Sequence, residues 1–257
     1  MKEFWENQAK QFKGGMSAVN FDLMEEELEH SLLMGLLRDN TDICDVGCGN
    51  GRLILHFAEK LPGARFFGMD FSENMVASAR EEAARRKIGN AEFAVADATA
   101  PGAFAFGARR KFDTVISKRL LINTKGRGKY TAADNILEIL KPGGRYLMIE
   151  CFIEPLQRVN DIRNTLGLPA ITVKEFNEYL TEGFVSDLAG KFTLERKVDF
   201  ESLYYFISRV FNAGLSSGQP KYDAPINKLA VKLALAGVAP IEGLGPETLH
   251  IWAPKSV

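Results

Sequence analysis

Short apolar runs alternate with helical patterns between residue 41 and about residue 151. Each run is bounded by turn residues, as is typical of strands that are covered on both faces of a sheet. This alternation predicts βαβ units and a mostly parallel sheet. The expected strands are Thr41–Val46, Arg65–Asp70, Ala91–Ala96, Phe112–Ser117 and Arg145–Cys151.

The segments between these runs have helical spacing. Apolar residues from Leu53 to Leu61 form one stripe, which stops at Pro62 and Gly63. Ser72 is a suitable N-cap for the next helix, because its hydroxyl can accept a hydrogen bond from a free backbone N–H group. A run of Lys-Pro-Gly-Gly at 141–144 ends a further helix before the fifth strand.

The two ends of the chain differ from this middle part. Two further strands are expected near the C-terminus, with helices between them. We expect these strands to extend the same sheet and the helices between them to form an inserted cap. The pattern therefore predicts an α/β fold with a Rossmann-like, mostly parallel seven-stranded sheet, helices on both faces and a helical cap near the C-terminus. The expected outer elements are helices at Lys2–Lys13, Val173–Leu180, Phe200–Phe211 and Ile226–Leu235, and strands at Lys191–Phe200 and Thr248–Ala253.

Composition narrows the class of protein. The chain has 257 residues, of which 46% are hydrophobic and 25% charged, so a packed core is expected. The net charge of −1, with basic residues spread along the chain, argues against nucleic acid or an anionic membrane as an obligatory partner. No apolar run approaches the roughly 18 residues of a membrane span. The charged stretch Met1–Gln11 lacks an apolar signal core, so a cytoplasmic protein is expected.

Cysteine and histidine usage does not predict a metal site. The cysteines Cys44, Cys48 and Cys151 form no Cys-x-x-Cys pair, and the chain has only three scattered histidines. A zinc site needs about four ligands. We expect reduced, buried cysteines and no metal.

The glycine turn Asp45-Val46-Gly47-Cys48-Gly49-Asn50-Gly51 closes the first strand and opens the first helix. Glycines there let the backbone turn tightly and approach a ligand without a Cβ in the way. The following helix N-terminus presents free N–H groups to a polar or anionic group. Without other signals, such a turn is also compatible with a simple strand–helix connection.

Two acids follow at the ends of the next two strands. Asp70 ends the second strand, where a carboxylate can accept hydrogen bonds from both hydroxyls of a ribose, and Asp97 ends the third. Each acid alone would be equally typical of a helix N-cap. Together with the glycine turn they mark three successive carboxyl ends of strands, the edge where open α/β sheets bind ligands.

The spacing of the turn disfavours a dinucleotide. A dinucleotide fingerprint requires glycine at its sixth position, which here is Arg52, and the chain has no phosphate-binding Gly-Lys-Ser/Thr motif. The pattern therefore favours an adenosine ligand without a pyrophosphate.

Residues 41–151 resemble class I S-adenosylmethionine-dependent methyltransferases, with the family's motifs in order. Asp45–Gly51 resembles the first motif, 112–117 the fourth, and Leu140–Ile149 the run into strand five. The resemblance implies S-adenosylmethionine as cofactor and S-adenosylhomocysteine as product, with Asp70 at the ribose and Asp97 at the adenine. The implied cofactor residues are Asp45, Gly47, Cys48, Gly49, Gly51, Asp70, Phe71, Met75, Asp97, Ala98 and Ser117.

The resemblance also suggests how the chain is divided. Phe4–Ala9 resembles the lid helix of small-molecule members, and the segment from 151 to 247 resembles the C-terminal part of methyltransferases of polysaccharide and small-molecule biosynthesis. We therefore expect N-terminal lid helices at 1–40, a cofactor-binding core at 41–151, and a helical substrate cap with the last strands at 152–257.

Acceptor residues are less clearly marked. The fourth strand ends in Ser117-Lys118-Arg119 and lacks the Asn/Asp-Pro-Pro-Tyr/Phe motif of many amine methyltransferases. Lys118 and Arg119 are candidates for an anionic acceptor or are surface charges. Glu150, at the end of strand five, is the best candidate general base, or a solvated acid. Further substrate candidates, which exposed polar surface explains equally well, are Asn160, Arg163, Tyr205 and Arg209.

The leading hypothesis is O-methylation of a small molecule or a bacterial glycan. N-methylation of protein or RNA, and a non-catalytic S-adenosylmethionine-binding module, remain as alternatives. An NAD-dependent dehydrogenase conflicts with Arg52 and with the absence of a Tyr-x-x-x-Lys pair. The acceptor, the attacking atom and the oligomeric state do not follow from the sequence.

Overall fold

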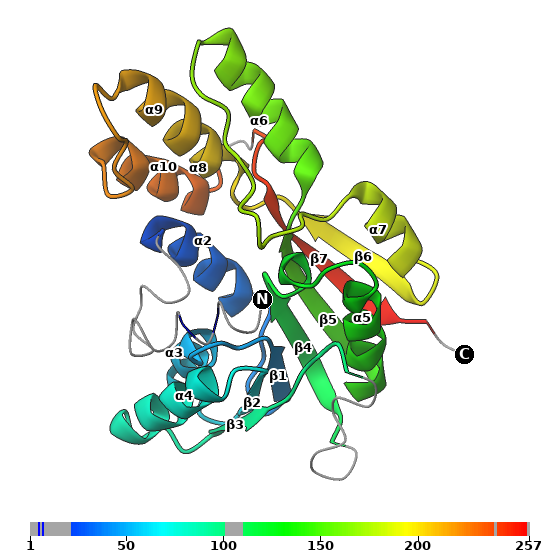
Figure 1. Cartoon of the computed structure of the whole chain (residues 1–257). Coiled ribbons are helices and arrows are strands. Elements are labelled where there is room, and N and C mark those ends of the chain that lie inside the picture. Colours follow the sequence, from blue (N-terminus) through cyan, green and yellow to red (C-terminus); the bar gives the residue numbers. More distant parts are fainter. Residues whose placement is uncertain (1–4, 6, 8–21, 101–109, 239–240, 256–257) are drawn as a thin grey trace.

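The computed structural model describes Trp5, Asn7 and residues 22–100, 110–238 and 241–255. The strands are β1 (Asp42–Val46), β2 (Arg65–Asp70), β3 (Ala91–Val95), β4 (Phe112–Lys118), β5 (Leu140–Cys151), β6 (Phe192–Val198) and β7 (Glu247–Pro254). Within these residues they form one seven-stranded sheet in the order β3-β2-β1-β4-β5-β7-β6 (Figure 1). Each predicted strand is confirmed.

Strands β1 to β5 run parallel, and β7 runs antiparallel between β5 and β6. The strand order reverses between β1 and β4. At such a reversal the following connections leave on opposite faces of the sheet, which opens a crevice at the carboxyl ends of the strands. The predicted mostly parallel sheet is thus confirmed, and the edge at which we expect a ligand to bind corresponds to the carboxyl ends of β1 and β4.

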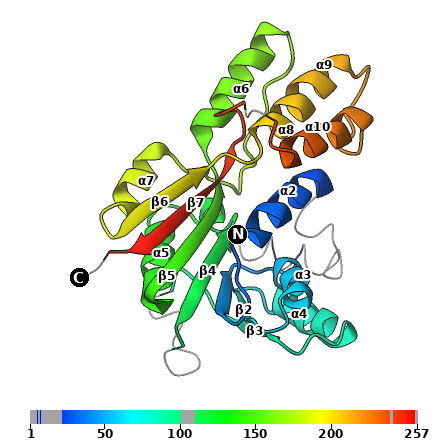
Figure 2. The ribbon, with the colours of Figure 1, turned by 180° about the vertical axis from the view of Figure 1, so that it is seen from behind.

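Helices cover both faces of the sheet (Figures 1 and 2). One face carries α2 (Leu23–Met34), α3 (Arg52–Lys60) and α4 (Glu73–Arg85), and the other carries α5 (Gly128–Ile139) and α7 (Glu182–Leu188). Successive strand residues alternate between the two resulting cores. Ile43 packs into the core under α3, whereas Cys44 packs into the core under α5. This alternation follows from the two-residue period of a strand.

The starts of two of these helices are fixed by side-chain caps. Ser72 Oγ accepts a hydrogen bond from the backbone N–H of Met75 at 3.2 Å, which confirms Ser72 as the N-cap of α4. Asp22 caps α2 in the same way, through the backbone N–H groups of Met24 and Glu25. Both caps satisfy donors that a helix N-terminus otherwise leaves unpaired.

A helical cap extends beyond the sheet. It contains α6 (Ile153–Thr165), which follows β5, and then α8 (Ser202–Phe206), the π-helical turn η3 (Ile207–Phe211), α9 (Asn212–Leu215) and α10 (Pro225–Leu235), which lie between β6 and β7. Figure 2 shows these helices beside the N-terminal part of α2. Leu28 of α2 packs with Tyr204, Ala230 and Val231 of the cap. Helix α2 therefore joins the cap to the sheet.

Some predicted helices differ from the structure. The predicted helix Val173–Leu180 is wrong: the segment is made of turns, and Leu180 forms a bridge with Phe152. Its backbone makes one internal hydrogen bond, from the N–H of Asn177 to the carbonyl oxygen of Lys174, and otherwise pairs with Ile122, Cys151 and Ile153. Helices α6 and α7 were not predicted. Of the predicted helix Lys2–Lys13, only Trp5 and Asn7 lie among the described residues, where both are helical.

Two features of the described residues bear on the class of protein. The helices of the described ranges lack the length and apolar character required to cross a bilayer. All three cysteines are free and buried, as expected.

Candidate functional site

The glycine turn has the backbone conformation that its sequence predicts. Gly47, Gly49 and Gly51 have positive φ angles of 81°, 53° and 74°, which L-residues with a side chain rarely adopt. The N–H groups of Gly47 and Cys48 both donate to the carbonyl oxygen of Met69, at 2.7 and 2.9 Å. These bonds tie the turn to the end of β2.

Space at the turn is also restricted. A Cβ at Gly47 would lie 3.0 Å from Cδ1 of Leu120, which follows β4. The turn therefore touches the chain segment at the end of β4, across the crevice between the two strands.

Asp70 joins the turn to the next helix. Its Oδ2 accepts the N–H of Gly49 at 2.9 Å, and its Oδ1 accepts the N–H of Ser72 at 2.9 Å. The side chain is 8% exposed. Two backbone donors thus fix the carboxylate at the end of β2, beside the glycine turn, where the sequence predicts ribose binding.

Asp45 lies below the turn and is buried. Its Oδ1 receives no hydrogen bond from the described residues. Burial raises the pKa of Asp45 to about 7, with Lys118 opposing the rise and Asp70 adding to it. A buried carboxylate oxygen without a donor is costly. A ligand that brings a donor or a positive charge to the turn would lower this cost.

The remaining predicted adenosine contacts follow β2 and β3 in the sequence. Asp97 is exposed, and its Oδ1 accepts the N–H and the hydroxyl of Thr99 at 2.9 and 2.7 Å. Ala98 is buried and its carbonyl oxygen accepts Nδ2 of Asn135 at 2.8 Å. Phe71 is half-buried and Met75 is buried.

Cys48 differs from the other predicted contacts. Its side chain packs into the core under α3, and burial raises the pKa of its thiol well above the usual value. Its Sγ donates to the carbonyl oxygen of Gly49 at 3.6 Å, and its backbone N–H donates to Met69, so the thiol and the backbone both stabilise the turn.

Ser117 and Glu150 connect the ends of β4 and β5. Both are fully buried. Ser117 Oγ lies 2.7 Å from the Tyr146 hydroxyl and 3.3 Å from Oε1 of Glu150. Glu150 also accepts the backbone N–H groups of Leu120, Leu121 and Ile122 at 3.0, 2.9 and 3.2 Å, at the start of the short helix η2 (Leu121–Asn123).

This geometry bears on the predicted role of Glu150. Burial raises its pKa to about 7, and the three N–H groups oppose the rise. Because both carboxylate oxygens already accept hydrogen bonds from the chain, the contacts favour a positioning role for the segment after β4. Its assignment as a general base stays a prediction.

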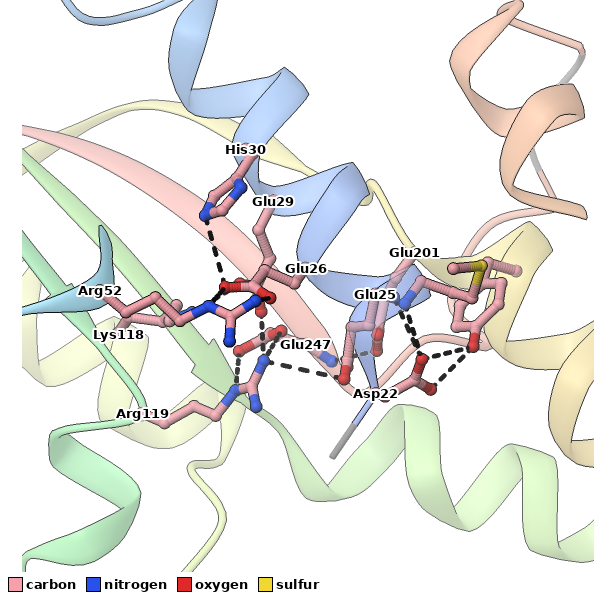
Figure 3. Close-up of polar contacts among 12 residues, drawn as sticks. Asp22, Glu25, Glu26, Glu29, His30, Arg52, Lys118, Arg119, Glu201 and Glu247 are labelled. Carbon is pink, nitrogen blue, oxygen red and sulfur yellow. Dashed lines mark hydrogen bonds and ion pairs between the residues drawn. The ribbon is translucent and has the colours of Figure 1, made fainter. Parts of the chain in front are cut away.

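Lys118 and Arg119 are paired with acids. They belong to a group that we call the ionic cluster, which consists of Glu25, Glu29, Lys118, Arg119, Glu201 and Glu247 (Figure 3).

Within this cluster, Lys118 Nζ lies 2.6 Å from Glu29, and Arg119 pairs with Glu29 and, at 2.7 Å, with Glu247. Burial alone would raise the pKa of Glu29, but Lys118 and Arg119 lower it to about 2. The two basic residues that the sequence offered for an anionic acceptor therefore have carboxylate partners within the chain.

The predicted substrate residues of the cap are also bonded within the protein. Asn160 makes two hydrogen bonds to the backbone of Ile171, at 2.9 and 2.8 Å. Arg163 donates to the carbonyl oxygens of Pro169 and Arg209. The structure thus places Asn160 and Arg163 in contacts that hold the segment after α6.

Tyr205 and Arg209 lie together in the cap. The Arg209 guanidinium lies 5.1 Å from the ring centre of Tyr205 and 4.7 Å from that of Tyr222, and it pairs with Asp22 at 2.8 Å. Tyr205 itself is buried. These contacts link η3 to the start of α2.

The acids of the ionic cluster were missed in the sequence. Glu25 and Glu29 lie in the acidic run of α2, Glu201 precedes α8, and Glu247 opens β7. The acidic run near residue 25 and the acid directly before the predicted last strand were the available signals. Neither identifies its partner, because the partners lie about ninety or more positions away.

The fold and site define a nucleoside-binding protein of the Rossmann-like class. A family model described as "Methyltransferase domain" matches residues 37–191, which is more than half of the chain. The chain belongs to this family and is a class I S-adenosylmethionine-dependent methyltransferase, with S-adenosylmethionine as its cofactor.

Individual relatives are more distant. The chain is 38% identical over 79 residues to nocamycin O-methyltransferase of Saccharothrix syringae, which covers 30% of this chain and 27% of the relative. It is 35% identical over 109 residues to demethylmenaquinone methyltransferase of Lactococcus lactis subsp. lactis (strain IL1403), covering 42% and 41%. The chain thus spans less than half the length of these two curated relatives in each match.

A solved structure matches over nearly the whole length. The TehB-like SAM-dependent methyltransferase of Corynebacterium glutamicum ATCC 13032 Kitasato superposes with a TM-score of 0.57 at 16% identity, covering 98% of this chain and 99% of the other. At this identity the likeness shows the fold.

The residues present fit the cofactor. S-adenosylmethionine carries an ammonium and a sulfonium, and the buried Asp45 oxygen without a donor is the kind of group that a cationic ligand satisfies. The conformation of the glycine turn keeps side chains away from the ligand edge, and Asp70 is held beside it by backbone donors.

Proposed function

We propose that this protein transfers the methyl group of S-adenosylmethionine to a hydroxyl group of a small-molecule acceptor. The observation that carries the proposal is the pairing of Lys118 and Arg119 with Glu29 and Glu247. Nucleic-acid binding depends on basic side chains that are available to phosphates. At the end of β4 the basic side chains are instead held by acids of the same chain.

Two further observations support a compact acceptor with a hydroxyl group. The cap helices α6 and α8 to α10 extend beyond the sheet and join it through α2 (Figure 1). The matched relative from Saccharothrix syringae is named as an O-methyltransferase of nocamycin. A free sugar or a glycan would offer the same kind of hydroxyl group as an acceptor. A cytoplasmic location stays a prediction.

The chain's contribution to the reaction is mainly orientation. When bound, the cofactor supplies an electrophilic methyl group on a sulfonium. The glycine turn and Asp70 hold the donor at the ends of β1 and β2, and the segment Lys118–Leu120 borders the turn from β4. Alignment of two reactants in this way is worth about 7–11 kcal/mol of the barrier. A hydroxyl acceptor also benefits from a general base, which the described contacts do not identify.

The test is transfer of label from S-[methyl-³H]adenosylmethionine to a panel of phenols and free sugars, with small amines, a lysine peptide and transfer RNA as comparison acceptors. We expect labelled methyl ethers from a hydroxyl-bearing small molecule, and no label in RNA. The Asp70→Asn variant should show weaker labelling at low concentrations of S-adenosylmethionine.

Label recovered on the lysine peptide or on RNA would replace the proposal with N-methylation of a macromolecule. Tight cofactor binding without formation of S-adenosylhomocysteine with any acceptor class would instead support a non-catalytic binding module.

A further inference from the structure

Three carboxylates meet at the β7 end of the ionic cluster. Glu25 comes from α2, Glu201 directly precedes α8 and Glu247 is the first residue of β7. One carboxylate oxygen of each lies within 4.8 Å of the others. Glu201 and Glu247 are fully buried. Figure 3 shows Glu25 and Glu201 side by side, and Glu247 next to Arg119.

The local backbone holds Glu201 in this position. Its Oε1 accepts the N–H of Glu247 at 2.6 Å. A Cβ at Gly245 would lie 2.6 Å from Cγ of Glu201, so the chain before β7 wraps closely around this side chain. The carboxylate therefore has little freedom to turn toward solvent.

The second oxygen of Glu201 is the independent observation that points to a ligand. Oε2 is buried, and no described residue donates a hydrogen bond to it. A buried carboxylate oxygen without a donor or a cation is strongly unfavourable. Glu25 and Glu247 each have a carboxylate oxygen within 4.8 Å of one of Glu201, and ionised carboxylates cannot donate a hydrogen bond.

The charges of the ionic cluster also favour a bound cation. Its four carboxylates face two cations, Lys118 and Arg119. Lys118 pairs with Glu29, and Arg119 pairs with Glu29 and Glu247, while Glu25 is 3.7 Å from Arg119. When all four carboxylates are ionised, a state that burial disfavours by raising the pKa of Glu201 and Glu247, two negative charges are in excess within the described residues. The nearby Asp22 does not change this count, because it pairs with Arg209.

We propose that Glu25, Glu201 and Glu247 form a binding site for one divalent cation of the oxygen-preferring class, such as Mg²⁺, Mn²⁺ or Ca²⁺. Carboxylate oxygens are the ligands that these cations prefer, and water completes their coordination. A double positive charge balances the two excess carboxylates and provides Oε2 of Glu201 with a partner. Glu247 bridges the cation and Arg119, because each carboxylate oxygen has two lone pairs.

The sequence predicted no metal site, because its cysteines and histidines do not form a ligand set, and this carboxylate site departs from that expectation. The proposal does not rest on the proposed O-methylation, since it concerns binding at the β7 end of the cluster. Its test therefore uses binding readouts without S-adenosylmethionine or an acceptor.

The experiment uses the full chain, dialysed against a chelator and then titrated separately with Mg²⁺, Mn²⁺ and Ca²⁺. We expect one site by calorimetry, and loss of the free Mn²⁺ signal in electron paramagnetic resonance at one equivalent. At a concentration about 100-fold above Kd, the cation should raise Tm by about 5 °C or more. Folded Glu201→Gln should lose all three responses.

Matched variants keep the test decisive. Glu25→Gln alters the less buried acid of the three and should weaken Mn²⁺ binding at least tenfold. Glu27→Gln changes an exposed acid of the same helix and should bind as the wild type does. An absence of binding, or binding unchanged in Glu25→Gln and Glu201→Gln, would overturn the proposal. Higher Tm of metal-free Glu201→Gln with no cation response in the wild type would show that a shared proton occupies the site instead.

Discussion

The carboxyl edge of the sheet has two halves that are built in different ways. At the ends of β1 to β3, the site consists of backbone conformation and short-range contacts, such as the two N–H groups that hold Asp70. At the ends of β4 and β5 and the start of β7, side chains from distant parts of the sequence are joined by buried ion pairs. Lys118 and Arg119 are 89 and 128 positions from their partners Glu29 and Glu247.

Because of this difference, we expect the two halves to contribute differently to ligand binding and to folding stability. Local backbone bonds in the first half shape a surface for a ligand and cost little to maintain. A buried ion pair in the second half contributes little net stability, yet removal of one partner leaves a charge buried without compensation. We therefore expect mutations of the first half to affect cofactor binding most, and mutations of the second half to affect folding most.

The largest effect is expected from Arg119→Met. The substitution keeps the length of the side chain but leaves Glu29 and Glu247 without their guanidinium partner. Loss of one partner of a buried pair costs about 3–5 kcal/mol of unfolding free energy. Urea denaturation measures this loss. Arg145→Met is the control, because Arg145 pairs with Glu195 at the surface and should cost less than about 1 kcal/mol. Equal losses in the two variants would remove the distinction between the halves.

A smaller loss is expected from Glu150→Ala. The substitution leaves the N–H groups of Leu120, Leu121 and Ile122 without their acceptor. Each buried unsatisfied donor costs about 1–3 kcal/mol, and relaxation of the loop reduces the sum, so we expect a loss of about 3 kcal/mol. Glu150→Gln keeps an acceptor oxygen and should lose less. If thermal denaturation shows an unchanged Tm for Glu150→Ala, the positioning role is wrong and the role as a base gains support.

Asp70→Asn should act on binding. The amide keeps the size of the side chain but replaces one acceptor oxygen and the negative charge. A hydrogen bond to a charged group is worth about 1.5–3 kcal/mol, so we expect the Kd for S-adenosylmethionine to rise by roughly 10- to 100-fold. Calorimetry measures this change. Asp161→Asn, at an exposed position of α6, is the control and should bind normally. Wild-type affinity in Asp70→Asn would contradict the assignment of the first half.

The smallest effect concerns acid sensitivity where α2 meets α3. His30 and His56 stack with ring centres 3.9 Å apart, and burial lowers the pKa of each to about 4. Glu26 and Arg52 face the pair and bond to each other. In the unfolded chain a histidine has a pKa of about 6.5, so below that pH the unfolded state binds protons that the folded state does not. The contribution of the two neutral histidines to the unfolding free energy is therefore complete above pH 6.5 and is lost as the pH falls toward 4.

We therefore expect the unfolding free energy to fall by about 1 kcal/mol per histidine between pH 7.5 and pH 5.5. His56→Phe retains a stacked ring that cannot be protonated, so its urea midpoint should depend less on pH over this interval. An identical pH dependence in His56→Phe and the wild type would exclude this source of acid sensitivity.

The backbone geometry of the first half of the edge could be predicted from the sequence because its signals are local. Gly47, Gly49 and Gly51 require unusual φ angles, and Asp70 ends a strand whose apolar pattern is plain. The strands could be predicted as well, because strands that are buried on both faces of the sheet form short, continuous apolar runs in the sequence. Helix α7 was missed because it has only seven residues, too few to show a helical period.

The second half was not predictable in the same way. Lys118 and Arg119 suggested an anionic acceptor, since nothing near them in the chain shows that Glu29 and Glu247 are their partners. The wrong helix at Val173–Leu180 has a similar origin, because most of its backbone bonds go to residues 122 and 151–153. In both cases the structure depends on contacts between residues that are far apart in the sequence.

A crystal structure with S-adenosylhomocysteine tests the central claim most directly. The account predicts that the ribose hydroxyls bond to Asp70, that the adenine lies beside Asp97 and Ala98, and that the homocysteine lies over Gly47–Gly51 with its sulfur toward Lys118–Leu120. A ligand bound at the β5–β7 end of the edge, or a ribose without contact to Asp70, would contradict it.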